Sequence, residues 1–315
     1  MLVEGKNGIK ARIVADSISE SGKRITTFEL EFPRFILPEF NTHRQFSRNS
    51  ASSRAIPVKK MIEIVNNNPA TPVHWGKNQP GMQADEECSN LIEYTEHPFN
   101  NKEITREQAW GNAKNAAVFW AQKFDEAGYH KQIVNRLLEP FQMMKTVVTA
   151  TEFDNFFWLR RHEDAQPEIK ELANCMYEAL WVSQPEKLKY GEWHTPYVEH
   201  KRNEDGSLSY VTIDGEQCDA ETALKVSASC CAQVSYRVLD GSVEKAISIY
   251  KRLVESKPVH ASPFEHQATP MGCFGNFSDH PAITHIDRSG NFWSGNLRGW
   301  IQHRQMIPDN VKKGY

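Results

Sequence analysis

The stretch that most constrains the fold is TTFELEF, residues Thr26 to Phe32, in which apolar and acidic side chains alternate. A period of two is typical of a β-strand that buries one face. Pro33 follows at once and ends the pattern, because proline cannot donate a hydrogen bond to a continuing ladder. The sequence therefore predicts a sheet strand here, with the segment after it emerging at the end of that strand, where functional residues are often found.

The segment that emerges there is NTHRQFSRNSASSR, Asn41 to Arg54, which holds one histidine, three arginines and five hydroxyl side chains but no acid. Arginine forks and short hydroxyl donors suit a phosphate group or the carbonyl edge of a pyrimidine. The net charge of the chain is −3, so any binding of a polyanion must come from a local cluster such as this one. A solvated basic loop without a ligand is the alternative.

Further along, periodicity and turn residues predict mostly helices. Helices are expected over 58–65, 105–128, 130–138, much of 149–181 with a bend near Pro167, 221–236 and 243–256. Residues 66–83 are rich in Asn, Pro and Gly and predict a long ordered loop. Residues 189–217 contain two Asp-Gly turns around SLSYVTI and predict a hairpin.

Composition indicates a globular, intracellular protein. The 315 residues are 39% hydrophobic, enough for a sizeable core, and no apolar run approaches the roughly 20 residues of a membrane helix. The N-terminus lacks the apolar stretch of a secretion signal, so we expect a cytoplasmic protein with no membrane contact. The six cysteines include no C-x-x-C pair, which favours buried, reduced thiols.

A second candidate site lies in NRLLEP (135–140) and TATEFDNFFWLRRHEDAQPEI (149–169). On a helix, Phe153, Phe156 and Arg160 share one face, which would place the arginine beside an aromatic wall suited to a base or a flavin ring. An amphipathic core helix with a surface arginine is the alternative. His260 and His266 are six residues apart with Pro263 between them, which is not the spacing of a zinc site, so no metal is expected.

Taken together, these segments resemble the flavin-dependent thymidylate synthase family. THRQFSRNSASSR is similar to the family signature R-H-R-x-x-S-x-N-x-x-S-x-R, with Thr42 in place of the first arginine. NRLLEP is similar to the family's A-R-x-x-L-P, and FFWLRRHEDAQPEI to its F-l-x-L-R-x-x-x-x-A-Q-x-E-I. The resemblance implies an α+β fold, with a mainly antiparallel sheet and long helices.

AQVSY (232–236) and SPFEH (262–266) also resemble family motifs, but in the family these precede the signature. NLRGWIQHR (296–304) resembles the approach to the signature a second time. We therefore expect a permuted or rearranged member with three parts. Residues 1–188 would hold the signature strand, the nucleotide and flavin loop and the helices, 189–220 a hairpin connector, and 221–315 a permuted segment packing on the same core.

The resemblance implies an enzyme that transfers a one-carbon unit from methylenetetrahydrofolate to C5 of a deoxypyrimidine monophosphate, most simply dUMP. FAD would supply the hydride and NADPH would reduce the FAD. Arg160 would polarise the pyrimidine and is the candidate catalytic residue. The residues that match nucleotide-binding positions, Arg160 included, are Ser52, Ser53, Arg54, Arg136 and Arg160. Those that match flavin-binding positions are His43, Arg44, Ser47, Asn49, Asn155 and His266. A homotetramer with sites shared between subunits is also implied.

This chain departs from the family at several positions. Thr42 stands where arginine is usual, Glu39 where glutamine is, Ser50 where glutamate is, and Thr149 and Thr151 where an N-x-R pair is. Losing two arginines should weaken flavin binding unless other cations replace them. Arg298 and Arg304, in the repeated C-terminal segment, are the candidates.

Three other functions fit the same residues. A variant enzyme could use dCMP or leave a hydroxymethyl group. A non-catalytic derivative could bind nucleic acid through its arginines, although the net charge of −3 argues against nucleic acid as a partner. A degenerate subunit could depend on an active partner.

Overall fold

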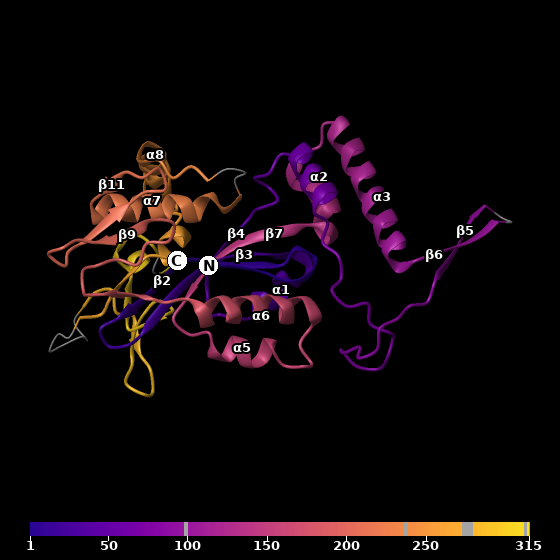
Figure 1. Cartoon of the computed structure of the whole chain (residues 1–315). Coiled ribbons are helices and arrows are strands. Elements are labelled where there is room, and N and C mark those ends of the chain that lie inside the picture. Colours follow the sequence, from indigo (N-terminus) through magenta and orange to yellow (C-terminus); the bar gives the residue numbers. More distant parts are fainter. Residues whose placement is uncertain (98–99, 236–238, 273–279, 312–313, 315) are drawn as a thin grey trace.

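A computed structural model describes residues 1–97, 100–235, 239–272, 280–311 and 314. Its main sheet has the order β1-β2-β3-β7-β4, with β8 beside β2 (Figure 1). All neighbours are antiparallel except β8, which runs parallel to β2. The strands are β1 (Leu2–Glu4), β2 (Lys10–Ser19), β3 (Arg24–Pro33), β4 (Ser47–Ser50), β7 (Met143–Ala150) and β8 (Glu186–Leu188). The fold is α+β, as the resemblance implies.

One face of this sheet is apolar and forms the largest core. Phe28, Leu30 and Phe32 of β3 are fully buried on it, which confirms the strand predicted from their alternation. Two helices cover this face, α5 (Asp154–Arg160) and α6 (Pro167–Val182), as Figure 1 shows. Burying a phenylalanine stabilises a fold by about 2–3 kcal/mol, so this face contributes much of the stability.

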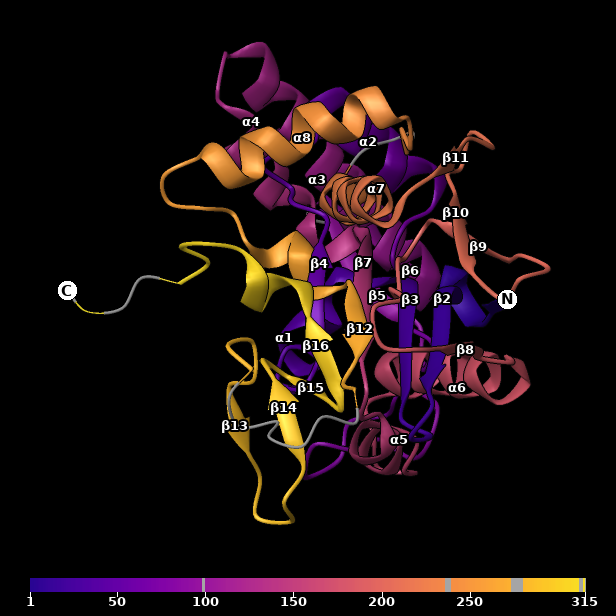
Figure 2. The ribbon, with the colours of Figure 1, turned by 90° about the vertical axis from the view of Figure 1, so that its left-hand side faces the viewer.

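The other face of the sheet is polar, yet it is also covered. The Thr27 side chain is fully buried there, and the Tyr197 hydroxyl donates to Oε2 of Glu29 over 2.9 Å. The covering segment is the C-terminal part of the chain, whose β12 (Ala268–Pro270) and β16 (Trp300–Gln302) lie over β4 and β7 in Figure 2. Strand β3 is therefore covered on both faces. Its apolar face packs against other apolar side chains, and its polar face makes hydrogen bonds to the segment that covers it.

A separate group of helices packs at the end of the sheet around its own core. It comprises α2 (Val58–Asn67), α3 (Arg106–Glu126), α4 (Lys131–Val134) and the 3-10 helix η3 (Asn135–Phe141). Helix α3 begins at a capping box, in which Thr105 and Gln108 each accept from the other's backbone N–H. The helices expected at 58–65 and 105–128 are confirmed.

The remaining elements are short or belong to the C-terminal part. The expected hairpin near 189–217 is present as three strands, and the helix expected over 243–256 is confirmed as α8. The helix expected over 221–236 is confirmed as α7 only up to Ala232, after which a 3-10 helix follows, and Tyr236 lies outside the described residues. In chain order the elements are η1 (Lys6–Gly8), η2 (Arg34–Ile36), α1 (Leu37–Phe40), β5 (Ile92–His97), β6 (Asn100–Ile104), β9 (Glu199–Arg202), β10 (Leu208–Val211), β11 (Gln217–Cys218), α7 (Ala220–Ala232), η4 (Gln233–Ser235), α8 (Val243–Glu255), η5 (Ser262–Glu265), β13 (His285–Ile286), β14 (Phe292–Ser294), β15 (Leu297–Arg298) and η7 (His303–Met306).

Two sequence predictions of helix are wrong in part. The helix expected over 149–181 begins only at Asp154, because residues 143–150 form the central strand β7, and it divides into α5 and α6, with Pro167 at the start of α6. The helix expected over 130–138 has one α-helical turn and continues as η3, which contains Pro140. Proline lacks the N–H that an α-helix interior requires.

None of the helices in the described part of the chain combines the length and the apolar character of a membrane span. The five cysteines described by the structure are free thiols, and three of them, Cys175, Cys230 and Cys231, are buried. Burial raises the pKa of the Cys230 thiol to about 12, so it stays protonated. The sixth, Cys273, lies outside the described residues.

Candidate functional site

The basic stretch begins as a tight turn between α1 and β4. Arg48 holds this turn, because its Nη1 atom donates to the carbonyl oxygens of Phe40 and His43, each over 3.2 Å. Burial lowers the pKa of Arg48, and the nearby charge of Glu265 partly opposes that effect. This arginine therefore stabilises the loop, and its neighbour Arg44 is the exposed one.

The turn places His43 against Arg160 at the end of α5. Nε of Arg160 donates to Nε2 of His43 over 2.9 Å, so the imidazole must be neutral and carry its proton on Nδ1. The ring of His43 meets Phe156 edge-on, with centroids 4.8 Å apart. The arginine expected beside an aromatic wall is therefore present, and the wall includes a histidine from the signature.

Electrostatics keep this histidine neutral. The side chain is nearly buried, and burial together with the charges of Arg160 and Arg48 lowers its pKa to about 4. The guanidinium of Arg160 is held at two more points: Nη2 donates to Oγ1 of Thr42 over 3.3 Å, and Nη1 lies 3.6 Å from Oε2 of Glu39. Two of the positions that depart from the family pattern, Glu39 and Thr42, thus contact the candidate catalytic arginine.

A cavity of about 300 Å³ opens beside this pair. It brings together segment 42–46 and the residues around α5, which are more than 100 positions apart in the chain. Six of its lining residues matter here: His43, Arg44, Phe46, Glu152, Asn155 and Arg160. Three of the predicted flavin-binding residues, His43, Arg44 and Asn155, therefore meet in one place with the predicted catalytic arginine.

The other predicted nucleotide-binding residues gather elsewhere, around Glu139. Oε1 of Glu139 accepts from Nη1 of Arg136 over 2.8 Å and from Oγ of Ser53 over 3.4 Å. Arg34 adds an ion pair to the same oxygen at 3.0 Å. Asn135 anchors the loop, because its Nδ2 donates to the carbonyl oxygen of Ser53 over 2.7 Å.

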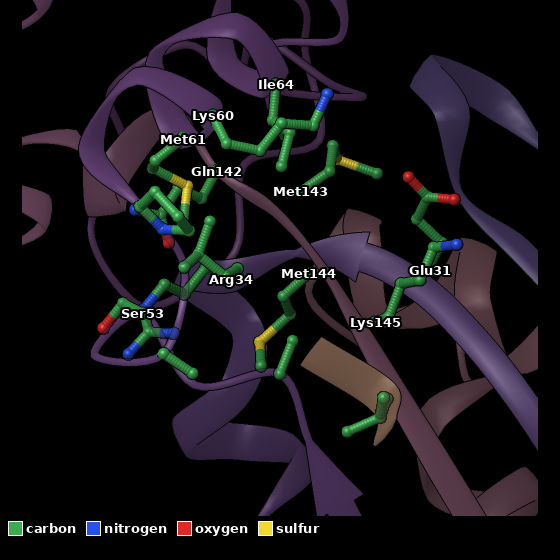
Figure 3. Close-up of a pocket in the computed structure, with 15 residues that line it drawn as sticks. Glu31, Arg34, Ser53, Lys60, Met61, Ile64, Gln142, Met143, Met144 and Lys145 are labelled. Carbon is green, nitrogen blue, oxygen red and sulfur yellow. The ribbon is translucent and has the colours of Figure 1, made fainter. Parts of the chain in front are cut away.

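A second cavity, of about 400 Å³, lies beneath this loop (Figure 3). Its wall is largely apolar, with Met61, Met143 and Met144, and Arg34 and Ser53 lie on one side of it (Figure 3). No residue lines both this cavity and the one beside His43. Within one copy, Ser53 and Arg160 therefore line different cavities, and Arg136 lines neither of the two.

Two arginines of the basic stretch are available to a ligand. Arg44 and Arg54 are exposed, and neither makes a hydrogen bond or an ion pair with any residue that the structure describes. Arg44 lines the His43 cavity, whereas Arg54 lies beside Ser53 on the other loop. An unpaired guanidinium is a ready partner for phosphate.

Three of the predicted flavin-binding residues do not line the His43 cavity. Ser47 and Asn49 bond to the C-terminal part of the chain, and His266 belongs to that part. Oγ of Ser47 donates to Oδ1 of Asn296 over 3.1 Å, and Nδ2 of Asn49 donates to the Cys231 carbonyl over 3.4 Å. His266 is fully buried, and burial lowers its pKa to about 3.

His266 belongs to a chain of buried hydrogen bonds that the sequence did not indicate. Nδ1 of His266 lies 2.8 Å from Oγ1 of Thr149, which is 2.6 Å from Oγ1 of Thr27. The Thr27 hydroxyl lies 2.8 Å from Nε2 of His194, whose Nδ1 is 2.9 Å from Oγ of Ser17. These contacts span residues 17 to 266, so only the folded chain reveals them.

The signature loop and the C-terminal segment NLRGWIQHR, which resembles the approach to it, lie next to each other, joined by Asn296. Its Nδ2 donates to the Gln45 carbonyl over 2.8 Å, and its Oδ1 accepts from Nε2 of Gln302 over 2.8 Å. Gln45 belongs to the signature, and Gln302 belongs to NLRGWIQHR. The C-terminal part therefore packs on the signature loop itself.

The two candidate replacement arginines are both paired. Arg298 donates to both carboxylate oxygens of Glu152, which lines the His43 cavity. Arg304 is bound to Glu265 and to the Asn310 carbonyl. Of the two, only Arg298 adjoins the cavity.

Comparisons with known proteins agree with the motifs. Residues 24–186 match the family model described as "Thymidylate synthase complementing protein". The curated protein "Flavin-dependent thymidylate synthase" of Aquifex aeolicus (strain VF5) is 28% identical over 158 residues, which are 49% of this chain and 44% of that protein. The chain thus spans less than half the length of this relative.

Two solved structures are also similar. The UMP/dUMP methylase PolB from Streptomyces cacaoi, bound with 5-Br dUMP, has a TM-score of 0.42 and 16% identity, covering 56% of this chain and 92% of that one. The flavin-dependent thymidylate synthase ThyX from Helicobacter pylori, complexed with FAD and dUMP, has a TM-score of 0.34 and 14% identity, covering 50% and 67%.

The family match includes both segments of the His43 cavity, 42–46 and 152–160, and ends before the C-terminal part. It covers more than half of the residues in the chain. This chain belongs to the thymidylate synthase complementing protein family.

Proposed function

We propose that this protein is a flavin-dependent methylase, which transfers a one-carbon unit from methylenetetrahydrofolate to C5 of a deoxypyrimidine monophosphate, most simply dUMP. The observation that carries the proposal is the convergence of His43, Arg44, Asn155 and Arg160 on one cavity. The curated relative is named a flavin-dependent thymidylate synthase, and PolB is titled a UMP/dUMP methylase, which is consistent with the same chemistry.

The residues of the His43 cavity fit the ring end of a flavin. Phe46 and Phe156 offer apolar surface to a flat ring, the neutral His43 and the amide of Asn155 offer hydrogen-bonding edges, and Arg44 offers a positive charge. Bound there, FAD would supply the hydride, and NADPH would reduce it. Ser47, Asn49 and His266 would support this wall from behind, through their contacts at the interface with the C-terminal part.

Arg160 is the residue that we assign to the pyrimidine. The bond from its Nε to His43 fixes the plane of the guanidinium, while its two Nη atoms make only long contacts, of 3.3 and 3.6 Å. A planar donor pair held in this way can polarise a carbonyl edge without reorganising during the reaction. Neutral His43 is suited to this role because a charged imidazole would repel the guanidinium.

We further propose that the complete site is shared between copies of the chain in a homo-oligomer, by analogy with the tetramer that the resemblance implies. Ser52, Ser53, Arg54 and Arg136 would bind the nucleotide phosphate from one copy, and Arg160 would reach the base from another. The separation of the two groups within one chain supports this arrangement.

The rearranged order of motifs is part of the same proposal. Residues 221–315 would take the place that the N-terminal third has in an ordinary member, with 1–188 as the signature part and 189–220 as the connector. Hydrogen bonds from Asn296 to the signature loop and from His266 to Thr149 support the packing of this segment on the same core.

One observation favours a variant substrate. Glu39 stands 3.6 Å from Arg160, where the family has glutamine. An ionised carboxylate only accepts hydrogen bonds, so it would favour the exocyclic amino group of cytosine over a carbonyl oxygen. Use of dCMP is therefore the second candidate.

Two experiments test the proposal. An absorbance spectrum of the purified protein should show a flavin band near about 450 nm. Product analysis by mass spectrometry, with dUMP and dCMP offered in turn, should show a mass gain at C5 that depends on methylenetetrahydrofolate and NADPH. A colourless protein that cannot be loaded with FAD, and whose DNA affinity falls steeply with salt, would contradict the proposal and favour a nucleic-acid-binding derivative.

A further inference from the structure

Glu152, at the edge of the His43 cavity, is shared by two cations from opposite ends of the chain. Its Oε1 and Oε2 atoms accept from Nε and Nη2 of Arg298, over 2.6 and 3.0 Å. Nζ of Lys23 contacts the same Oε1 atom. All three side chains are partly accessible, with exposed fractions of 20%, 31% and 22% for Glu152, Arg298 and Lys23.

Neighbouring side chains fix the backbone at both cationic residues. The Arg298 N–H donates to Oγ1 of Thr151 over 3.0 Å, and Nε1 of Trp300 donates to the Lys23 carbonyl over 3.2 Å. Gly299, which lies between Arg298 and Trp300 in the chain, has a φ of +73°, and a Cβ atom there would meet the Lys23 side chain at 3.3 Å. The corner between β15 and β16 is therefore built to lie closely against Lys23.

The charges at this edge do not balance. One carboxylate, Glu152, faces two cations, and Arg44 lines the same cavity without any partner among the described residues. Arg160 does not alter this balance, because Glu39 lies next to it. An excess of positive charge beside a cavity attracts a ligand with two negative charges, such as a diphosphate.

We propose that Lys23 and Arg298 form an anion subsite at this edge of the cavity, which binds the phosphate groups of a flavin whose ring lies beside His43. In the free protein Glu152 occupies the donors of Arg298, and an incoming phosphate competes with it for them. This inference rests on the proposed function, since it assumes a flavin in the cavity. It also accounts for Thr151, because its hydroxyl holds Arg298 at the position where the family has an arginine of its own.

The test compares three flavins that differ in phosphate content. Kd values for FAD, FMN and riboflavin are measured by flavin fluorescence on the full-length chain. Arg298→Gln should raise Kd for FAD and FMN about tenfold and leave riboflavin, which carries no phosphate, unchanged. Lys23→Gln should act in the same direction, and Glu152→Gln should lower Kd for FAD because it removes the competing carboxylate.

Controls separate binding from folding. Arg252→Gln removes an equal charge from the exposed face of α8 and should leave all three Kd values unchanged. Arg298→Lys should recover part of the FAD affinity. If Arg298→Gln weakens riboflavin as much as FAD, the residue only supports the fold and the subsite is wrong. If the wild-type chain binds none of the three flavins, the proposed function fails as well, so the two failures are distinguishable.

Discussion

Arg160 and His43, 117 positions apart in the chain, are joined by a hydrogen bond of 2.9 Å in which the guanidinium donates and the imidazole accepts. The bond requires a neutral histidine, and the pKa of about 4 ensures one at physiological pH. The signature loop and helix α5 are thereby coupled, because a change in the charge of Arg160 alters the pKa of His43, and protonation of His43 would break its hydrogen bond to Arg160.

Replacing Arg160 should therefore be visible at His43. In Arg160→Gln the positive charge that disfavours the imidazolium is gone, so the pKa of His43 should rise from about 4 while burial still holds it below 6.5. Titration of the His43 ring protons by NMR measures this shift. Arg161→Gln, one residue further along and bonded to Asn174 instead, is the matched control. An unchanged His43 pKa in Arg160→Gln would contradict the pairing.

Acid should destabilise this protein in a defined pH window. His43, His266 and His303 have pKa values lowered by burial to about 4, 3 and 4, against 6.5 in an unfolded chain. As the pH falls below 6.5, the unfolded chain binds protons that the folded chain does not, so the free energy of unfolding decreases. A histidine shifted to about 4 costs the folded state about 3 kcal/mol by pH 4.

Urea unfolding at a series of pH values measures this loss. His303→Phe should make the pH dependence shallower by about the contribution of one histidine, since the ring already packs among aromatic residues. If the free energy of unfolding of the variant falls between pH 6.5 and 4 as steeply as that of the wild type, His303 does not contribute to the pH dependence.

Breaking the chain of buried hydrogen bonds should lower the free energy of unfolding, and the effects of two substitutions in it should not add. Thr149→Val keeps the shape of the side chain but leaves Thr27 and His266 each short of a partner, at a cost of about 2 kcal/mol. Thr27→Val should cost a similar amount. Because the two hydroxyls bond to each other, the double variant should cost less than the sum of the single variants, as measured by urea unfolding. Strict additivity would show that the two residues act independently.

Glu39 should influence the choice of base. Glu39→Gln restores an amide, which can both donate and accept, so the ratio of kcat/KM for dUMP to that for dCMP should rise by about tenfold. The measurement is the same product assay with both nucleotides. A ratio that does not change would exclude Glu39 from base recognition.

A shared site can be tested by mixing inactive variants. If Arg54 and Arg160 act from different copies, then co-expressing Arg54→Gln with Arg160→Gln should restore about a quarter of the native sites. Each variant alone should be inactive. A mixture that stays inactive, although the two chains assemble together, would mean that one copy supplies the whole site.

The sequence predicts the elements whose patterns are local. Strand β3 follows from its alternation, and α3 follows from the spacing of Trp110 and Ala117. The sequence does not predict strand β7, because its inner residues, Val147 and Val148 among them, are buried on both faces. Such a run has no period of two to distinguish it from a buried helix.

The sequence also predicts only part of the candidate site. In the structure His43, Asn155 and Arg160, which come from two separate motifs, line one cavity. The motifs do not reveal that Ser47 and Asn49 bond to the C-terminal part, because those contacts depend on residues 180 or more positions away. Arg298 is a candidate from the sequence, but no spacing rule finds Lys23, whose side chain meets Arg298 through Glu152.

The chain of buried hydrogen bonds from His194 through Thr27 and Thr149 to His266 also limits how this protein can evolve. Each threonine hydroxyl has a single proton, so it can donate in only one direction, and the two imidazoles must adopt matching tautomers. A substitution at one position leaves its neighbour with the wrong donor or acceptor. Among homologues that keep this C-terminal segment, residues 27, 149, 194 and 266 should therefore change together or not at all.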